Sequence, residues 1–440
     1  MTLLVISPDY ASHLLPLATI ATAWRDRGHR VVVATGPATA DIVAGFGFER
    51  VHLQLGRGSN PGVIRADEQP RDEADSLRGF FAATREGMVP TLAYQAKERL
   101  TDLMWDPVAA GRATLRIVAD LRPEAILIDH LAFSARLALD AAGHDYADVV
   151  LGHPSALPVR DELYGFPPAW PDAFRPTGAE LSALRELCER VSQNFTREWN
   201  RATAQLDAAA TPTASAFATH GPRVFYNYPA QLRPEASVDG AVFLGSTRRV
   251  EPADAEVEAW LADAVPFVYV SFGSFLSVRA DVLRRVADAL RALGVRAAIA
   301  SGSTPVAELG EIPGGWLVRP YLPQVRLLGA AAAAVTHGGN NSVTEGLGAG
   351  VPLLVLPFST DQFAGAAAIE AARVGLSLDP NVADGSAIAD AVASLLDGRA
   401  VDAATLEAIA ADQRAAPGPE RAYRSLTSAR IAEASSDAVR

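Results

Sequence analysis

The sequence of 440 residues has a single cysteine, Cys188, which excludes a disulfide framework and a thiolate metal site. It also lacks any apolar run of the ~18–20 residues that would be needed to span a bilayer. The apolar stretch at residues 2–6 has no basic flank before it and ends at Pro8 and Asp9, unlike a targeting segment. We therefore expect a soluble, cytoplasmic protein without stable membrane insertion.

Positive charge is also scarce in this chain. The 39 basic residues face 51 acidic ones, which gives a formal net charge of −12. Binding to nucleic acid needs a positive field, so we expect no nucleic-acid partner. Hydrophobic residues make up 49% and charged residues 20% of the chain, a composition that builds large cores and excludes a disordered or fibrous protein.

Common motifs of phosphate binding and catalysis are missing too. The one lysine, Lys97, follows no glycine-rich run, so the chain has no phosphate loop of the GxxxxGK[ST] type. The sequence has neither an HExxH zinc motif, nor a GxSxG nucleophile elbow, nor an Asp-x-Asp pair for a metal. The first apolar stretch is followed by Ser-Pro-Asp-Tyr rather than GxGxxG, which argues against a dinucleotide-dependent dehydrogenase.

Two parts of the chain repeat the order strand, helix, strand. The predicted segments are residues 3–7, 14–27 and 30–35, and then residues 267–271, 280–293 and 295–301. Continuous apolar strands between amphipathic helices indicate parallel sheets buried on both faces. Further strands are predicted at residues 124–128, 148–152, 223–227, 316–319, 333–336, 352–356 and 375–378. This repeat predicts an α/β protein with two Rossmann-like domains.

Composition changes along the chain indicate where the domains meet. Residues 228–252 are rich in proline, glycine and polar side chains, as is typical of a linker. Residues 56–73 are charged without periodicity and predict a long surface loop, and residues 420–434 predict a last helix. We expect a first domain at residues 1–235, a second at 236–416, and a C-terminal helix at 417–440.

The strongest single motif is Thr-His-Gly-Gly-Asn-Asn-Ser-Val-Thr-Glu at residues 336–345, which follows a predicted strand and opens a helix. Two glycines let an anion approach the backbone, and the amides of the first helical turn point toward it. His337 can add a hydrogen bond or a positive charge. The alternative is purely structural, with Ser342 and Glu345 as a capping box and the glycines in a tight turn.

His13 and Asp129 form a second point of interest. Each follows or ends a predicted strand, so both should lie at the carboxyl edge where parallel sheets bind ligands. A histidine base oriented by a carboxylate activates a hydroxyl group. The alternatives are a structural histidine and an aspartate that caps the helix after residue 130.

Together these residues resemble the family 1 nucleotide-sugar glycosyltransferases, in particular the bacterial antibiotic and macrolide enzymes. Residues 321–362 look like their donor-binding signature, with Tyr-Leu-Pro-Gln, His-Gly-Gly-Asn-Asn-Ser, Glu, Gly-Val-Pro and Asp-Gln in this order. The resemblance extends to residues 268–274, to His-x-x-Pro at 13–16 and to Asp129. It implies the GT-B fold, with two Rossmann-like parallel-sheet domains facing a cleft and the C-terminal helix returning to the first domain.

The resemblance also implies roles for individual residues. Tyr321 stands where the family usually has a tryptophan that stacks on the nucleobase, and Ser12 stands where it often has glycine. Glu345 would bind the ribose hydroxyls. The base would be held by the backbone of Gln324 and Val325, the diphosphate by Ser274, His337, Gly339, Asn341 and Ser342, and the sugar hydroxyls by Asp361 and Gln362.

The implied function is that of an inverting glycosyltransferase, with the first domain holding the acceptor and the second holding the donor. His13 would act as general base supported by Asp129, moving a hexose or deoxyhexose from a UDP- or dTDP-sugar to a hydroxyl of a hydrophobic aglycone of polyketide, macrolide or polyphenol type. We expect no metal, no cofactor beyond the nucleotide-sugar co-substrate, and a monomer or homodimer. The alternatives are a catalytically silent nucleotide-sugar-binding auxiliary protein and another GT-B enzyme, such as an epimerase or a cell-wall glycosyltransferase.

Aromatic side chains in the first domain predict the acceptor pocket. They gather in residues 80–105 and in the proline-dense residues 154–174, which make a poor core element and predict a rigid loop. Aromatic walls with few charges suit a large apolar acceptor. The predicted pocket residues are Phe81, Met88, Tyr164, Phe166 and Trp170. The alternative is that part of this set belongs to the ordinary core.

Overall fold

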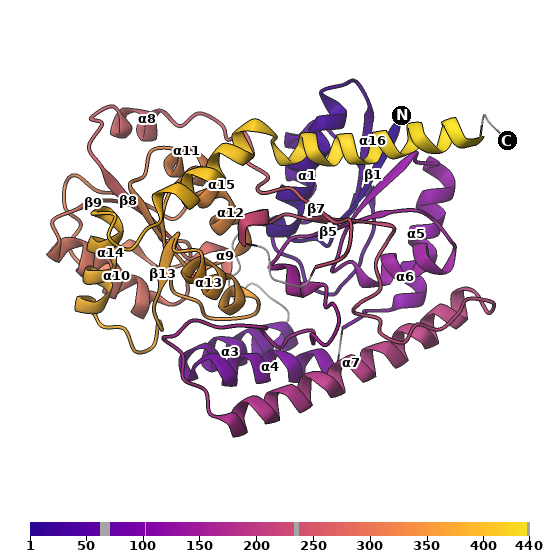
Figure 1. Cartoon of the computed structure of the whole chain (residues 1–440), viewed down its shortest axis with the longest axis horizontal. Helices are drawn as coiled ribbons and strands as arrows, with labels where there is room; N and C mark the ends of the chain where they lie inside the picture. Colours follow the sequence, from indigo (N-terminus) through magenta and orange to yellow (C-terminus); the bar gives the residue numbers. More distant parts are fainter. Residues whose placement is uncertain (62–70, 102, 233–236, 438–440) are drawn as a thin grey trace.

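The computed structural model describes residues 1–61, 71–101, 103–232 and 237–437, with the side chains of 71–74, 101, 274–275 and 429–437 left out (Figure 1). Over these residues, two parallel sheets lie in separate halves of the molecule, and each sheet is packed between helices. The fold is therefore the predicted pair of Rossmann-like α/β domains.

Seven strands of the described chain form the first sheet, all parallel, in the order β3-β2-β1-β4-β5-β6-β7. Their bounds are β1 Thr2–Ile6, β2 Arg30–Thr35, β3 Glu49–His52, β4 Ala125–Asp129, β5 Ala147–Val150, β6 Arg223–Tyr226 and β7 Val242–Phe243. The central strand β1 pairs on both sides, with Leu3 opposite Val31 and Ala125. Its apolar side chains are buried because helices cover both faces of the sheet.

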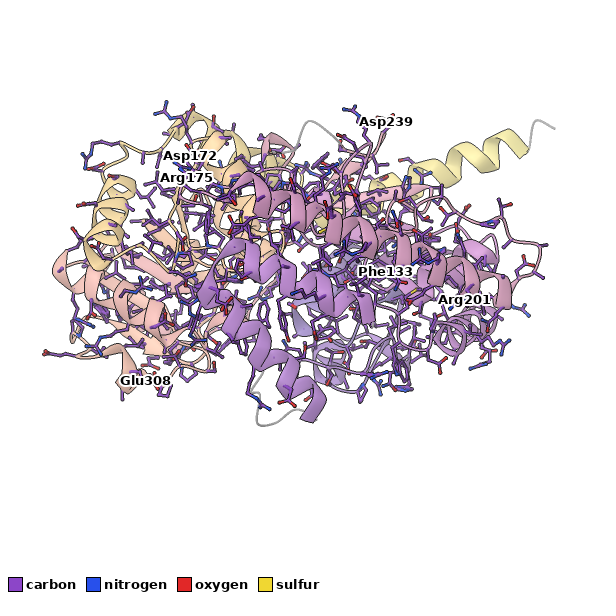
Figure 2. All side chains as sticks on the ribbon, turned by 90° about the horizontal axis from the view of Figure 1, so that it is seen from below. Phe133, Asp172, Arg175, Arg201, Asp239 and Glu308 are labelled. Carbon is purple, nitrogen blue, oxygen red and sulfur yellow. The ribbon has the colours of Figure 1, made fainter. Side chains whose placement is uncertain are left out.

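The helices of the first half connect these strands. They are α1 Ala11–Arg25, α2 Ala40–Gly45, α3 Arg71–Glu86, α4 Met88–Thr101, α5 Pro107–Leu121, α6 Phe133–Ala141, η2 Pro154–Ala156, α7 Gly178–Leu206 and η3 Ala230–Leu232. Figure 2 views the molecule from the side on which α7 and the α3–α4 pair lie in front of the sheets. Helix α4 packs against both α3 and α7. Helices α4, α6 and α7 share an apolar cluster, which includes Phe133 of α6 and Trp199 of α7.

The second sheet repeats the doubly wound pattern, with six described strands in the order β10-β9-β8-β11-β12-β13. The strands are β8 Phe267–Ser271, β9 Arg296–Ala300, β10 Leu317–Arg319, β11 Ala333–Thr336, β12 Leu353–Val355 and β13 Gly375–Ser377. The helices of this half are α8 Ala255–Leu261, α9 Gly273–Leu276, α10 Ala280–Ala292, η4 Val306–Leu309, α11 Gln324–Leu328, α12 Asn340–Gly348, α13 Gln362–Ala371, α14 Gly385–Leu396 and α15 Ala403–Ala415.

The last helix, α16 Gly418–Asp437, leaves the second half and lies along the first, as Figure 1 shows in yellow. It packs against α1, where the Tyr423 ring meets the edge of Trp24 at 5.1 Å between centroids. Arg27 adds an ion pair of 2.7 Å with Glu420. The predicted return of the C-terminal helix to the first domain is confirmed.

Three features of the sequence prediction need correction. The predicted surface loop at 56–73 ends too late, because α3 already begins at Arg71; residues 62–70 lie outside the described part. The predicted linker contains a strand, since β7 adds the two residues Val242–Phe243 to the sheet edge beside β6. The strand β3 is a third difference from the prediction: it has no apolar run, because Glu49, Arg50 and His52 are polar and exposed at the sheet edge.

Candidate active site

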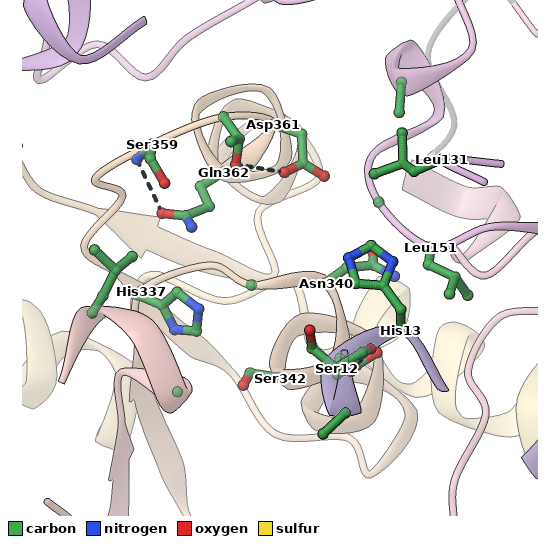
Figure 3. A pocket seen from close by; sticks show the side chains of 18 of the residues that line it. Ser12, His13, Leu131, Leu151, His337, Asn340, Ser342, Ser359, Asp361 and Gln362 are labelled. Atoms are coloured by element: carbon green, nitrogen blue, oxygen red, sulfur yellow. Dashed lines mark hydrogen bonds between the residues drawn. The ribbon is translucent and has the colours of Figure 1, made fainter. Parts of the chain in front are cut away.

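A cavity of about 770 Å³ lies between the two halves, at the carboxyl ends of the strands of both sheets. From the first half it is lined by residues that follow β1, β4 and β5, and from the second by residues that follow β8 to β12. Figure 3 shows the two sets of side chains facing each other across this cavity. Crevices at this edge are the usual ligand-binding places of doubly wound sheets.

His13 and Asp129 meet at this edge, as the strand pattern predicts. Strand β4 ends at Asp129, and His13 lies in the first turn of α1, which follows β1. His13 Nδ1 and Asp129 Oδ2 are 2.7 Å apart, and the carboxylate is 1% exposed while the imidazole is 27% exposed. Asp129 Oδ1 also accepts the backbone N–H of Leu131 at 2.8 Å, so this carboxylate orients the histidine and caps the following turn at once.

The pKa of His13 reflects burial, which lowers it, and two nearby carboxylates, which raise it. Burial lowers it, whereas the charge and hydrogen bond of Asp129 and the charge of Asp361 raise it, and the net result is a raised pKa. With Nδ1–H donated to Asp129, the lone pair of the neutral ring is on Nε2. The arrangement is that of a general base held in one tautomer by a buried carboxylate.

The glycine motif at 337–339 forms the turn between β11 and α12. Gly338 has φ +85°, and a Cβ there would lie 2.7 Å from Val355 Cγ1. A Cβ on Gly339 would lie 2.4 Å from His337 Nε2, so neither position tolerates a side chain in this turn. Gly339 is the N-cap of α12, and no described side chain caps its first-turn amides. Ser342 is inside the helix rather than at its N-cap, so the capping-box alternative is wrong, and the helix start is open to an anion.

The imidazole of His337 lines the cavity beside this helix start. Burial lowers its pKa to about 4. His337 is therefore neutral at neutral pH, and of the two predicted contributions only the hydrogen bond is available in this state. Gly273, with φ +67°, makes room for the ring, since a Cβ there would lie 2.9 Å from its Cε1 atom.

The carboxylate of Glu345 is buried, 4% exposed, behind the cavity wall. Arg249 donates to Oε1 at 2.6 Å, and the Gln324 amide donates to Oε2 at 2.6 Å. The Ser342 hydroxyl donates to Gln324 Oε1 at 3.3 Å, and Arg249 also pairs with Glu251 at 2.7 Å. Burial raises the pKa of Glu345, although Arg249 and Gln324 oppose that shift. Glu345 thus holds Gln324 and Arg249 directly and Ser342 through Gln324, and these three residues line the cavity.

Sequence reasoning missed Arg249. It lies in the stretch predicted as a linker, where proline, glycine and polar residues gave no sign of a binding role. Its guanidinium nevertheless reaches the donor half of the cavity and is only 14% exposed. Two successive arginines before Val250 and Glu251 are the one signal that the sequence offers.

Asp361 and Gln362 both line the cavity, at the start of α13. The Gln362 Oε1 atom accepts the backbone N–H of Phe358 and of Ser359, which fixes the loop before the helix. Asp361 Oδ1 accepts from the Thr360 hydroxyl at 2.9 Å (Figure 3). Its Oδ2 accepts the His153 backbone N–H of the other half at 2.6 Å. Asp361 therefore links the two halves next to the space where His13 lies.

A second link between the halves arises from the His-x-x-Pro sequence. Pro16 has no amide hydrogen, so the carbonyl of Ser12, four residues earlier, lacks its helical partner. Asn341 of α12 donates its side-chain amide to this carbonyl at 3.1 Å. The proline thus frees an acceptor that brings the start of α12 to the turn that carries His13.

The predicted acceptor residues divide into two groups. Tyr164 and Phe166 line the cavity, together with Phe80, which belongs to the aromatic segment 80–105 but not to the five predicted residues. In the described chain, Phe81, Met88 and Trp170 do not line it: Met88 is buried among α4 and α7, Trp170 packs against the same cluster, and Phe81 lies about 100° around α3 from Phe80.

Most predicted donor residues line the cavity wall. They are Tyr321, Gln324, His337, Gly339, Asn341, Ser342, Asp361 and Gln362. Val325 and Glu345 are set back from it in the described structure, and the predicted side chain of Ser274 lies outside the described residues. Tyr321 is 66% exposed at the mouth of the cavity.

The described side chains hold no group of three or more histidine, cysteine, aspartate or glutamate residues arranged as metal ligands. Among the described helices, none combines the length and apolar character that crossing a membrane requires.

The chain is similar to known proteins both in sequence and in fold. An uncharacterised glycosyltransferase of Mycobacterium tuberculosis is 27% identical over 382 residues, covering 85% of this chain and 86% of the relative. Demethyllactenocin mycarosyltransferase of Streptomyces fradiae is 26% identical over 361 residues, covering 79% and 69%. The solved structure of glycosyltransferase VinC in complex with dTDP superposes with a TM-score of 0.66 over 98% of this chain and 100% of that one, at 19% identity.

These similarities in sequence and structure agree with the observed fold. The two facing parallel-sheet domains are the GT-B fold of the solved glycosyltransferases. The sequence model of the UDP-glucoronosyl and UDP-glucosyl transferase family matches residues 185–420, more than half of the chain, including α12 and the whole donor half of the cavity. The chain is thus a glycosyltransferase and belongs to the UDP-glucoronosyl and UDP-glucosyl transferase family.

Proposed function

We propose that this enzyme moves a hexose or deoxyhexose from a UDP- or dTDP-sugar to a hydroxyl of a hydrophobic natural-product aglycone, with inversion at the anomeric carbon. The observation that carries the proposal is one shared cavity. The His13–Asp129 pair of the first sheet and the open start of α12 in the second sheet both line it. A base and an anion cradle on opposite walls are what a displacement reaction on a nucleotide sugar needs.

In the proposed reaction, His13 Nε2 takes the proton of the acceptor hydroxyl as its oxygen bonds to the anomeric carbon. The bond from that carbon to the diphosphate oxygen breaks, and the electron pair leaves with the diphosphate. Asp129 stabilises the imidazolium that forms. The first-turn amides of α12 and the His337 imidazole meet the charge of the leaving group, so we expect transfer to persist when a chelator is added.

The acceptor half of the cavity supports an apolar substrate. The rings of Tyr164, Phe166 and Phe80 line it, and Tyr164 is itself fixed by stacking on Phe217 at 4.0 Å between centroids. Large rigid rings provide wide apolar contact at low entropic cost. The relative from Streptomyces fradiae is named as a mycarosyltransferase acting on demethyllactenocin, which agrees with a natural-product acceptor.

The proposal is tested with the intact protein and two panels of compounds. A thermal-shift screen with UDP-glucose and several dTDP-deoxyhexoses identifies the donor, because a bound ligand raises the melting temperature without any acceptor. Hydroxylated polyketides, macrolides and polyphenols are then compared with free sugars as acceptors. Transfer to the apolar set supports the proposal. Donor binding without transfer to any acceptor contradicts it and favours an auxiliary protein.

Replacing Phe166 by alanine should raise the KM for apolar acceptors about tenfold, because truncation removes ring contact from the cavity wall. The KM for the donor should not change. Trp170→Ala is the matched control, since this aromatic residue belongs to the same loop but lies behind the wall. Equal effects of the two variants on acceptor KM would show that Phe166 does not contact the acceptor.

The pH profile should report the raised pKa of His13. The base must be neutral, so kcat/KM falls as the pH drops through a pKa above 6.5. Asp361 contributes to that raised value, so Asp361→Asn should move the acidic limb to lower pH even though it also weakens transfer. Asp172→Asn, at a fully exposed carboxylate, is the control and should leave the limb in place. A limb that stays fixed in Asp361→Asn would contradict the assignment of this pKa to His13.

A further inference from the structure

The part of the cavity wall that belongs to the first half contains a charged side chain, Arg99, that has no role in the proposed reaction. Helix α4 presents four polar residues to the cavity, namely Tyr94, Gln95, Glu98 and Arg99. They are spaced so that they share one side of the helix. Tyr94 donates to the Ser76 carbonyl at 2.9 Å, Gln95 accepts from the Thr360 amide at 3.2 Å, and Glu98 accepts from the Ser76 hydroxyl at 2.6 Å.

Arg99 differs from these neighbours. In the described part of the chain, its guanidinium forms no hydrogen bond and no ion pair, whereas the other charged residues of the wall, Glu98, Asp129, Arg249 and Asp361, all have polar partners. Arg99 lines the cavity, and the five donor hydrogens of its guanidinium have no acceptor among the described residues. Arginine in such a place is suited to bidentate binding of a carboxylate.

The surrounding residues hold the guanidinium in place. Its Cζ atom lies 5.0 Å from the centroid of the Tyr164 ring, a cation–π contact. Gly165 has φ +85°, and a Cβ there would lie 2.7 Å from Arg99 Nη1. The glycine thus leaves the space that the guanidinium fills, directly beside the aromatic wall made by Tyr164 and Phe166.

We infer that Arg99 binds an acidic group of the acceptor, a carboxylate on an aromatic or polycyclic aglycone, while the rings of Tyr164 and Phe166 contact its apolar body. This inference rests on the proposed function, because it assigns the chemical class of acceptor to the same cavity. In the proposed function the start of α12, in the other half, binds the donor diphosphate. Arg99 is therefore available to bind the acceptor. Glu98, which also lines the cavity, accepts a hydrogen bond from the Ser76 hydroxyl.

The test compares two acceptors that differ in one charge, a dihydroxyanthraquinone carboxylic acid and its methyl ester. Binding is measured by fluorescence titration without donor, and transfer is measured with the donor found in the screen. The acid should bind about tenfold more tightly than the ester. Arg99→Met should remove this preference without changing the donor Kd, Arg99→Lys should retain part of it, and Lys97→Met, an exposed cation on the same helix, should retain all of it.

Any other result contradicts either the role of Arg99 or the proposed function. Equal affinity of the acid and the ester, or an equal loss for both in Arg99→Met, shows that Arg99 does not bind the acidic group. A weaker donor Kd in Arg99→Met assigns the residue to the diphosphate instead. Because the titration needs no sugar transfer, it decides the role of Arg99 even when neither compound is glycosylated. The absence of transfer to every acceptor overturns the proposed function separately.

Discussion

Replacing His13 by alanine is expected to lower kcat by about 10²–10⁴-fold while leaving the Kd of the nucleotide sugar nearly unchanged. The imidazole lines the cavity and is held 2.7 Å from Asp129. Its loss removes the acceptor of the hydroxyl proton but breaks no described hydrogen bond to the donor half, because the imidazole bonds only to Asp129 among the described residues. Asp129→Asn should cause an equal or smaller loss, because the ring remains but is no longer oriented by a carboxylate.

Steady-state kinetics together with donor titration measure this prediction. His144→Ala is the matched control, since this histidine of the same domain is exposed outside the cavity and should leave kcat unchanged. If His13→Ala keeps nearly full activity across a pH series, the general-base role is wrong. If it loses donor affinity as strongly as kcat, the residue belongs to donor binding instead.

Glu345→Ala is expected to weaken the binding of nucleoside diphosphates about 10–100-fold and to lower the stability of the fold. The carboxylate holds the Gln324 amide and Arg249 at 2.6 Å each, and both of these residues line the donor half of the cavity. Hydrogen bonds to a buried charge contribute about 1.5–3 kcal/mol, which corresponds to the expected loss of affinity when the two residues that Glu345 holds are no longer kept in place. Removing one partner of a buried ion pair costs about 3 kcal/mol of unfolding free energy.

Glu251→Ala separates the two effects. Glu251 pairs with the same guanidinium at 2.7 Å, but among the described contacts only Glu345 also holds the Gln324 amide. This control should lower the melting temperature and leave the diphosphate Kd within about threefold of the starting value, as expected when only a supporting contact is lost. Titration calorimetry with the free nucleotide measures both variants. A lower melting temperature with unchanged affinity in Glu345→Ala would confine Glu345 to a structural role.

The parts of the site that could be predicted from sequence are those fixed by strand order. His13 and Asp129 follow neighbouring parallel strands, so the topology alone brings them to one edge, and the backbone of the 337–339 turn follows from its glycines. The buried strands were predicted because long apolar runs between helices leave few alternatives.

Side-chain direction could not be predicted in the same way. Helix α3 turns Phe80 rather than Phe81 to the cavity, and Met88 faces α7, because contacts between distant helices select the buried side. The sequence did not predict Arg249 or Arg99 as site residues, for a related reason. A charged residue in a linker or on a helix is usually solvated, and only the fold reveals that both guanidinium groups line one cavity.

The most direct test of the proposed chemistry is the anomeric configuration of the product. The purified enzyme, an α-linked UDP- or dTDP-hexose with equatorial substituents at C2, and a hydroxylated aromatic aglycone are incubated, and the glycoside is examined by proton NMR. Attack from the His13 wall on a donor held at α12 predicts a β-glycoside, with a large coupling between H1 and H2. An α-glycoside from the same donor would contradict single in-line displacement and the base role of His13.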